Sequence, residues 1–393
     1  MDERFNKLTL VDKDEAEEER AAGRPRMLLI GGIAVLVLAV ILAVFLILQG
    51  RKPYTRAVLV DQSEHTVSGE VSCRMFGGAL LRYSSSGAAL MQTDGKELWN
   101  HSYSMINPVV CLQGDYGAIA DLNGTNLIIF NKEGVTGNLY TDEPILAFSV
   151  SGYGVAAVAL DRNLTSVIRF YDKKASLLDI VISLEMSESG YPLAMALSPE
   201  GSGLLLSVVT SSLGELNSQL VFYNFSVGKS DSNRLIGYYN YEGTLFPKVE
   251  YLSDKTAVAV GDDRLEIFSL EQENKPQQSQ EILFDGELQD FASGNGYIAT
   301  ILPDPGSGQM RLSVRNTAGK EMFNQTVKGT GYHLQLAKDG VLLVTDTGVR
   351  YWNYKGRLRF EGMLEKSGHT VFSTGSKTLV QFDGGRIFEY ELR

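Results

Sequence analysis

The sequence predicts an all-β fold, a β-propeller of eight four-stranded blades that follows one transmembrane helix. Three observations lead to this prediction. An uncharged apolar run precedes residue 50, strand-like runs separated by Gly, Asp, Asn and Ser fill the chain from Glu70 onward, and one strand–turn–strand phrase returns at a regular spacing. No stretch after Glu70 keeps the 3.6-residue period of an amphipathic helix.

The apolar run is Met27 to Leu48, 22 residues without a charged side chain. As a helix it would be about 33 Å long, enough to cross a hydrocarbon core of about 30 Å. A secretory signal peptide has an apolar core of roughly 7–15 residues and a cleavage site of small residues, whereas this run ends in the polar stretch QGRKP. We therefore expect a membrane anchor that contacts the lipid bilayer through Met27 to Leu48.

The charges beside the anchor favour a cytoplasmic N-terminus. Within 15 residues of the run, four basic residues precede it and three follow it: Lys13, Arg20, Arg24 and Arg26, then Arg51, Lys52 and Arg56. By the positive-inside rule, residues 1–26 form a cytoplasmic charged tail and the propeller is extracytoplasmic. The tail is expected to be a mobile segment that helps to set topology, with a docking peptide as the alternative. Residues 49–53 form a short spacer, and the expected localisation is the cell membrane.

The repeated phrase is clearest in TDGKELW, Thr93 to Trp99, where a polar turn separates two apolar stretches. Echoes occur at Leu312–Phe323 and Val349–Phe360, with looser copies at 128–140 and 168–180. Each echo is a strand, a turn with Asp, Asn or Lys and often Gly, and a second strand, and another pair of strands precedes it. The unit therefore has four strands, and Thr93 to Trp99 is the turn between the third and fourth strands of the first unit.

The units recur at a nearly constant interval. They begin near Val71, Ile106, Pro144, Tyr191, Leu245, Leu288, Tyr332 and His369. Their mean spacing of about 43 residues is within the range of four-stranded propeller blades, so residues 54–393 are predicted to form one ring of blades. Seven blades remain the alternative, because residues 211–243 are long and irregular.

The two ends of the propeller segment are expected to close the ring. The last unit, which begins near His369, is one strand short at Arg393, whereas the strand-like segment Tyr54 to Asp61 has no partner before the first unit. Placing that segment as the missing fourth strand removes an exposed sheet edge, which would otherwise favour aggregation.

The phrase DGKELW, Asp94 to Trp99, resembles the repeat signature of pyrroloquinoline-quinone-like (PQQ-like) propellers, a superfamily close to WD40 propellers. The short charged tail, single anchor and C-terminal propeller are similar to an uncharacterised family of bacterial membrane-anchored proteins, a domain of unknown function. PQQ enzymes bind the quinone with calcium, a catalytic Asp and, commonly, adjacent cysteines. This chain has no adjacent cysteines and no Asp/Asn-rich calcium loop, so neither PQQ nor another cofactor is expected.

The composition argues against several classes of function. A net charge of −11 disfavours nucleic-acid binding, which needs a basic surface. The scattered histidines and two cysteines form no zinc motif. The stretch VGKS, Val227 to Ser230, has the end of a P-loop but Tyr223 where its first Gly is required. No catalytic or metal-binding residue is assigned, and Asp262–Asp263 is interpreted as a pair of solvated acids in a turn.

Two groups of residues remain as candidate sites. The first consists of four aromatic residues: Tyr238, Tyr239, Tyr241 and Phe246. They are the candidate stacking platform for a sugar or peptide on a propeller face, although packing between two blades is the interpretation that the sequence favours. The second group is Cys73 and Cys111, on the innermost strands of the first two blades. A disulfide between them needs Cα atoms within about 7 Å, and two buried free cysteines are the alternative that neighbouring innermost strands favour.

These observations predict an extracytoplasmic binding or scaffold module that presents one propeller face to a protein or cell-wall partner. The prediction rests on analogy between folds and on the missing catalytic signatures, since propellers carry many functions. Two alternatives stay open: a propeller-type hydrolase or lyase acting on envelope glycans, and a sensor that couples exterior binding to a cytoplasmic partner. Perturbed acids beside exposed aromatics would favour the enzyme, and an exposed apolar patch on a loop face would favour the binding module.

Overall fold

The computed structural model describes residues 35–40, 53–64, 70–212, 214–226, 234–272, 275–366, 368 and 370–393. The chain divides into two units, Met1–Pro53 and Tyr54–Arg393. In the first unit, the structure describes residues 35–40, which are helical with exposed side chains, and Pro53. The predicted tail and most of the predicted span Met27–Leu48 lie outside the described residues. Among the residues that are described, no helix is long and apolar enough to span a membrane.

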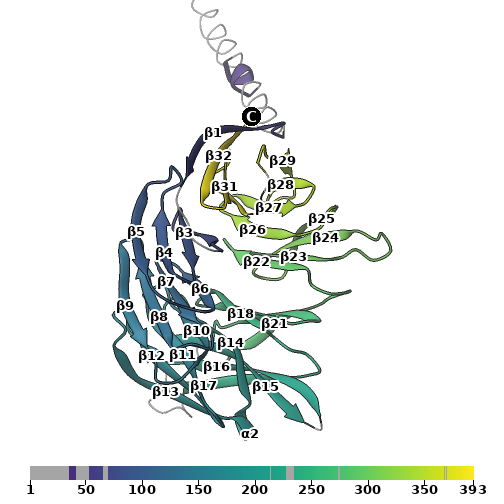
Figure 1. Cartoon of the computed structure of the whole chain (residues 1–393). Helices are drawn as coiled ribbons and strands as arrows, with labels where there is room; N and C mark the ends of the chain where they lie inside the picture. Colours follow the sequence, from purple (N-terminus) through teal and green to yellow (C-terminus); the bar gives the residue numbers. More distant parts are fainter. Residues whose placement is uncertain are drawn as a thin grey trace, which may run out of the picture. The chain divides into compact units, whose positions relative to one another are not determined.

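In its described residues, the second unit is all-β apart from one four-residue helix, α2 (Met186–Ser189). Its described residues form eight antiparallel sheets of four strands each, which are the blades of a propeller (Figure 1). Blade 1 consists of β2 (Ser72–Phe76), β3 (Ala79–Ser84), β4 (Gly87–Met91) and β5 (Glu97–Ser102). Blade 2 consists of β6 (Pro108–Gln113), β7 (Tyr116–Asp121), β8 (Asn126–Asn131) and β9 (Gly134–Tyr140). Blade 3 consists of β10 (Ile145–Val150), β11 (Ala156–Arg162), β12 (Thr165–Tyr171) and β13 (Leu177–Glu185).

The middle blades contain the longest strands. Blade 4 consists of β14 (Tyr191–Leu197), β15 (Gly203–Ser212), β16 (Glu215–Asn224) and β17 (Leu235–Glu242). Blade 5 consists of β18 (Lys248–Ser253), β19 (Thr256–Val260), β20 (Arg264–Ser269) and β21 (Gln277–Leu283). Blade 6 consists of β22 (Asp290–Gly294), β23 (Tyr297–Pro303), β24 (Met310–Asn316) and β25 (Glu321–Val327).

The last two blades bring the chain back to its beginning. Blade 7 consists of β26 (His333–Ala337), β27 (Gly340–Thr345), β28 (Gly348–Asn353) and β29 (Leu358–Gly362). Blade 8 consists of β30 (Thr370–Ser373), β31 (Thr378–Asp383), β32 (Arg386–Leu392) and β1 (Ala57–Glu64). The eight-blade prediction is confirmed, the seven-blade alternative is excluded, and each first strand begins within three residues of its predicted start.

Strand β1 closes the propeller as its sequence pattern predicted. It pairs antiparallel with β32, from Ala57 opposite Leu392 to Glu64 opposite Arg386, with a bulge after Leu59. In Figure 1 the dark β1 runs beside the yellow β32. The outer edge of blade 8 is therefore supplied by the beginning of the propeller segment, about 330 residues away in sequence.

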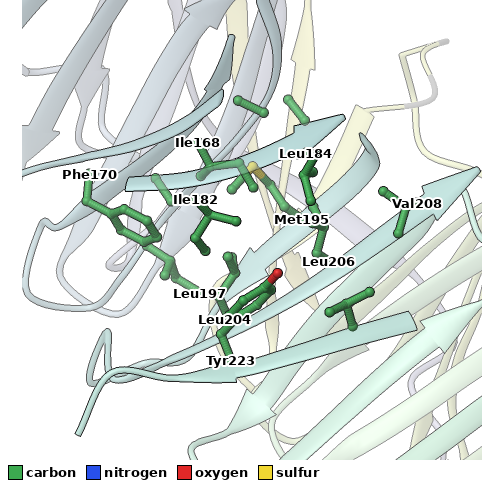
Figure 2. Packing of buried hydrophobic residues seen from close by; sticks show 14 residues of the cluster. Ile168, Phe170, Ile182, Leu184, Met195, Leu197, Leu204, Leu206, Val208 and Tyr223 are labelled. Atoms are coloured by element: carbon green, nitrogen blue, oxygen red, sulfur yellow. The ribbon is translucent and has the colours of Figure 1, made fainter. Parts of the chain in front are cut away.

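Hydrophobic packing joins every blade to the next. In the described residues, eight core clusters each combine side chains of two consecutive blades, and one of them joins blade 8 to blade 1. Figure 2 shows the cluster between blades 3 and 4, where Phe170 and Ile182 face Met195 and Leu206. Alternate residues of one strand enter two different clusters, as with Leu80 and Leu81 of β3. Both surfaces of each sheet are therefore covered.

The turn between third and fourth strands explains the repeated phrase. In blade 1 it spans residues 92–96, where the Lys96 amide donates to Asp94 Oδ1 (3.0 Å) and Gly95 has a φ of 87°. The side chains of Asp172, Asn316 and Asn353 accept the same kind of bond from the amide two residues on. Asp and Asn stabilise such turns through this contact, which is why they recur in the phrase.

The strand directions give the propeller two distinct faces. We call the one with the connections between blades, and the turns between second and third strands, the interblade face. We call the opposite one, where β1 begins and β32 ends, the terminal face. Every blade has the same strand order, so a residue's place along its strand tells which face it is near.

Candidate functional site

The predicted aromatic platform lies at the seam between blades 4 and 5. Tyr238 of β17 is 57% exposed, whereas Phe246, on the connection to β18, is fully buried. The ring centroids of Tyr241 and Phe246 are 4.7 Å apart in an edge-to-face contact. The ring centroids of Tyr239 and Phe268 of blade 5 are 5.0 Å apart. The four residues therefore do not share one exposed surface.

Tyr239 fastens the outer strands of the two blades to each other. Its hydroxyl donates to the Pro276 carbonyl oxygen (2.9 Å) and accepts from the Gln278 amide (3.2 Å). Tyr239 and Tyr241 both belong to the apolar cluster of this seam, together with Phe246. For these three residues the structure has the packing between two blades that the sequence favoured, and only Tyr238 remains free to contact a ligand.

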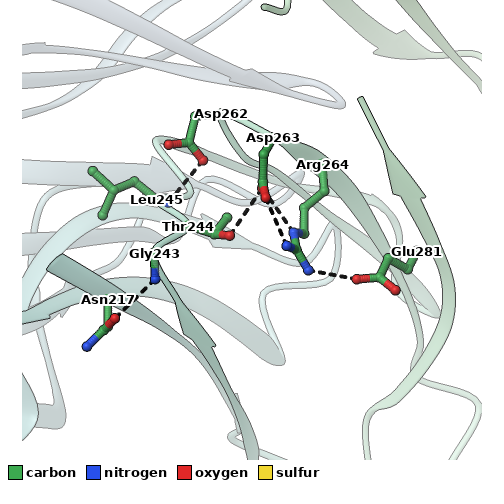
Figure 3. A network of polar contacts seen from close by, with 8 residues as sticks. All are labelled: Asn217, Gly243, Thr244, Leu245, Asp262, Asp263, Arg264 and Glu281. Atoms are coloured by element: carbon green, nitrogen blue, oxygen red, sulfur yellow. Dashed lines mark hydrogen bonds and ion pairs between the residues drawn. The ribbon is translucent and has the colours of Figure 1, made fainter. Parts of the chain in front are cut away.

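An ion-pair network covers the interblade end of the same seam (Figure 3). Arg264 Nε and Nη2 donate to the two carboxylate oxygens of Asp263 (2.9 and 2.8 Å), and Nη1 donates to Glu281 Oε1 (2.7 Å). Thr244 Oγ1 donates to Asp263 Oδ1 (3.1 Å), and the Leu245 amide donates to Asp262 Oδ1 (3.2 Å).

This network gives the acidic turn a structural role. The Arg264 guanidinium holds the pKa of Asp263 below its usual range. Both acids of the turn bind the connection between β17 and β18, since Thr244 and Leu245 belong to it. Asp262 and Asp263 lie in a turn as interpreted, but they have partners in the protein rather than water alone.

Beneath the network, a carboxyl group that the sequence analysis did not single out is enclosed. Glu266 of β20 is fully buried. Its Oε2 accepts from Gln278 Nε2 (2.8 Å), and its Oε1 has no hydrogen-bond partner among the described residues. Burial, with the nearby Glu281 carboxylate as a further cause, raises the pKa of Glu266 to about 7.

Three hydroxyl groups at this seam are also without partners in the described part of the chain. They are Ser207 Oγ, Ser218 Oγ and Tyr241 Oη. Each lies two residues along its strand from a side chain that packs against blade 5, namely Leu205, Leu220 and Tyr239. Because alternate residues of a strand point to the same side, all three hydroxyl groups face the seam. Burial raises the pKa of Tyr241. Because Glu266 is fully buried, its raised pKa does not make it a general acid for an external substrate.

The two cysteines are free thiols. Cys73 is buried in β2, and burial raises its pKa to about 12. Cys111 of β6 is partly exposed, and its Sγ lies 3.9 Å from Ser149 Oγ of blade 3. The structure therefore has no disulfide between blades 1 and 2. Within the described ranges, no group of three or more His, Cys, Asp or Glu side chains is arranged to hold a metal ion.

The feature that remains as a candidate functional site is the interblade face. Six hydrophobic residues with more than half of their surface exposed lie there: Ile106, Tyr140, Leu164, Leu216, Leu283 and Met363. They come from the connections or strand ends of six different blades. On the terminal face, the described hydrophobic residues with more than half of their surface exposed are Tyr153 and Leu177. We call the six residues the apolar set.

Sequence reasoning missed the apolar set because its members are single hydrophobic residues in polar turns. Ile106 is 94% exposed in the sequence SMINP, and Leu164 is 78% exposed in DRNLT. A single apolar residue on a surface is common. The signal appears only when the topology assigns six of them to one face.

Comparison with solved structures supports the fold. The Dos1 propeller is similar with a TM-score of 0.54 at 12% identity, over 86% of this chain and 95% of that one. BamB from Moraxella catarrhalis has a TM-score of 0.49 at 10% identity, over 86% of this chain and 100% of that one. The Pan2 WD40 domain of Neurospora crassa has a TM-score of 0.43 at 8% identity, over 86% and 98%. At these identities the likeness to the Dos1 propeller shows the fold alone.

Comparison with curated proteins gives no match. A family model, by contrast, covers nearly the whole propeller and its spacer, residues 50–392. Its description is a family of unknown function, DUF5711, in agreement with the resemblance to an uncharacterised family drawn from the tail, the anchor and the C-terminal propeller. The chain, an eight-bladed β-propeller in its described C-terminal part, belongs to the DUF5711 family.

Proposed function

We propose that this protein is a binding module that docks a protein partner on the interblade face of its propeller. The observation that carries the proposal is the apolar set, six strongly exposed hydrophobic residues from six blades on one face. Exposed apolar groups on one side of a rigid scaffold are typical of protein-interaction surfaces, where a few buried side chains provide most of the affinity.

The proposal includes a location. The uncharged run Met27–Leu48 anchors the protein in the cell membrane, the N-terminus is cytoplasmic and the propeller is extracytoplasmic. The chain enters the propeller through β1 at the terminal face, and no member of the apolar set lies on that face. The net charge of −11 supports a protein partner over a nucleic acid.

Site-specific photo-crosslinking in intact cells tests the docking surface. A photoreactive phenylalanine analogue is placed at Ile106 or Met363 in the full chain, and at Leu177 on the terminal face as the matched exposed control. We expect discrete crosslinked products from Ile106 and Met363 that an added Leu164→Asp substitution removes. Equal products from Leu177, or none from the interblade positions, would contradict the proposed surface.

Protease treatment of wall-stripped cells tests the location separately. Peptides from 70–393 should be released by external protease while residues 1–26 stay protected. Protection of the propeller would refute the topology and leave the docking surface to be tested in the cytoplasm.

A further inference from the structure

A second feature of the structure lies on the surface of blade 1 that faces blade 8. The outer part of blade 1 carries a pocket of about 310 Å³ at its interblade end. Small-molecule sites begin at roughly this size, about 300 Å³. The pocket is lined mainly by β3, β4 and β5, with Val71 at its inner margin.

The strand register explains why there is a hollow here. Arg82, Ala89 and Asn100 form one row across β3, β4 and β5, and Ser84, Gly87 and Ser102 form the next row. Both rows lie on the surface of blade 1 that faces blade 8, because Leu80, Ala89 and Met91 pack against blade 8. The middle strand contributes only Gly87 and Ala89, so little side-chain volume fills the space.

Arg82 is an uncompensated positive charge beside this hollow. Its Nη1 is buried, and Arg82 makes no hydrogen bond or ion pair with any described residue. None of the described residues that line the pocket is acidic. Its cross-strand neighbour Cys73 does not supply a negative charge either, because burial raises the pKa of that thiol to about 12. Arginine always carries its charge. Arg82 is half-buried, and its Nη1 lacks both water and a protein partner, which costs solvation free energy.

The other lining residues include polar side chains, among them three serines, Asn100 and His101, beside Val71, Tyr83, Gly87 and two alanines. Ser86 and Ser102 are exposed hydroxyl groups. The Asn100 amide nitrogen donates to Glu97 Oε1 (2.7 Å), which leaves its carbonyl oxygen as an acceptor. One cation surrounded by hydroxyl groups and an amide matches a small anion that also carries hydroxyl groups.

We propose that this pocket binds a small hydroxylated anion, whose carboxylate or phosphate group pairs with Arg82. The planar guanidinium accepts such a group in a two-point contact that lysine cannot reproduce. Ser102 and Asn100 contact the hydroxyl groups of the ligand. This site is separate from the docking surface and does not depend on it.

Calorimetric titration of the full chain in detergent tests the proposal. The probes are D-glucuronate for the carboxylate, glucose 6-phosphate for the phosphate, and D-glucose as their neutral counterpart. We expect saturable binding of at least one anion and none of D-glucose. Arg82→Gln should weaken that binding at least tenfold, about 1.4 kcal/mol, and Arg82→Lys should recover only part of it.

Two further variants separate a built site from a general positive field and from misfolding. Arg74, on the neighbouring strand β2, is an exposed arginine of the same blade, so Arg74→Gln should leave the affinity unchanged. Ser102→Phe adds volume at an exposed position of the pocket without touching Arg82, and it should abolish binding in a folded protein. The proposal is overturned if neither anion binds, if D-glucose binds equally well, or if Arg74→Gln weakens binding as much as Arg82→Gln.

Discussion

Replacing Glu266 with Gln should stabilise the propeller in a pH-dependent way. Glu266 is fully buried between blades 4 and 5, and one of its carboxylate oxygens has no partner among the described residues. Gln has nearly the same shape, keeps an oxygen that accepts the Gln278 Nε2 bond, and cannot ionise. The substitution therefore removes the charge and leaves the packing in place.

The sign and size follow from the pKa of Glu266, which burial raises from 4.5 to about 7. Between these values the folded state holds a proton that the unfolded state has released, so the free energy of unfolding falls as pH rises. The stabilising contribution is complete below about pH 4.5 and lost above about pH 7. At about 1.4 kcal/mol for each pH unit, the full loss is about 3 kcal/mol. Glu266→Gln should escape it.

Urea unfolding of the full chain in detergent, followed by tryptophan fluorescence, measures this effect. Trp99 in blade 1 and Trp352 in blade 7 report on distant parts of the ring. We expect the variant and the natural protein to agree near pH 4 and to differ by about 3 kcal/mol near pH 8. Glu271→Gln is the control, because Glu271 lies just after β20 and is 64% exposed. A constant difference across this pH range, or the same trend in Glu271→Gln, would refute the reasoning.

Three other measurements test the architecture. Ala175 has a positive φ of 64° in the turn between third and fourth strands of blade 3, and Gly356 occupies the equivalent position in blade 7. Ala175→Gly should therefore raise the free energy of unfolding by about 0.5 kcal/mol, and Gly356→Ala should lower it. A lower free energy of unfolding in both variants would contradict the turn conformation. Phe382 packs at the seam of blades 8 and 1, so Phe382→Ala should cost about 3 kcal/mol in urea unfolding, whereas a negligible cost would mean that the ring is open there. In a Cys111→Ser variant, Cys73 should react with a disulfide reagent only after unfolding, because burial raises its pKa to about 12; rapid reaction in the native protein would contradict its placement.

The fold was predictable because turn chemistry and strand hydrophobicity are local. The Asp94–Gly95 turn needs a polar acceptor and a residue tolerant of positive φ, and both requirements are visible in the sequence. The closing strand β1 was predictable by counting, since an unpaired strand at one end matched a missing strand at the other. The span Met27–Leu48 remains a prediction from its length and lack of charge.

The polar residues inside the seams were not predictable from the same patterns. In RLEIFS of β20, polar and apolar residues alternate, which is typical of a strand with one solvated surface. In the propeller both surfaces of β20 are covered, so Leu265 and Ile267 face blade 6 while Glu266 is buried against blade 4. The four aromatic residues from Tyr238 to Phe246 were ambiguous for the same reason, because aromatic side chains suit a seam as well as a surface.

Coverage of both sheet surfaces also decides where binding chemistry can be placed in this protein. A charged side chain on a second or third strand must enter a seam, where it needs a partner or loses much of its solvation. Arg264 has its partners in Asp263 and Glu281, whereas Glu266 meets the same problem through a raised pKa. Arg82 cannot lose its charge by deprotonation, and its buried Nη1 has no partner among the described residues. That difference is why the anion site belongs beside Arg82, while the apolar set, outside the seams, remains free for a protein partner.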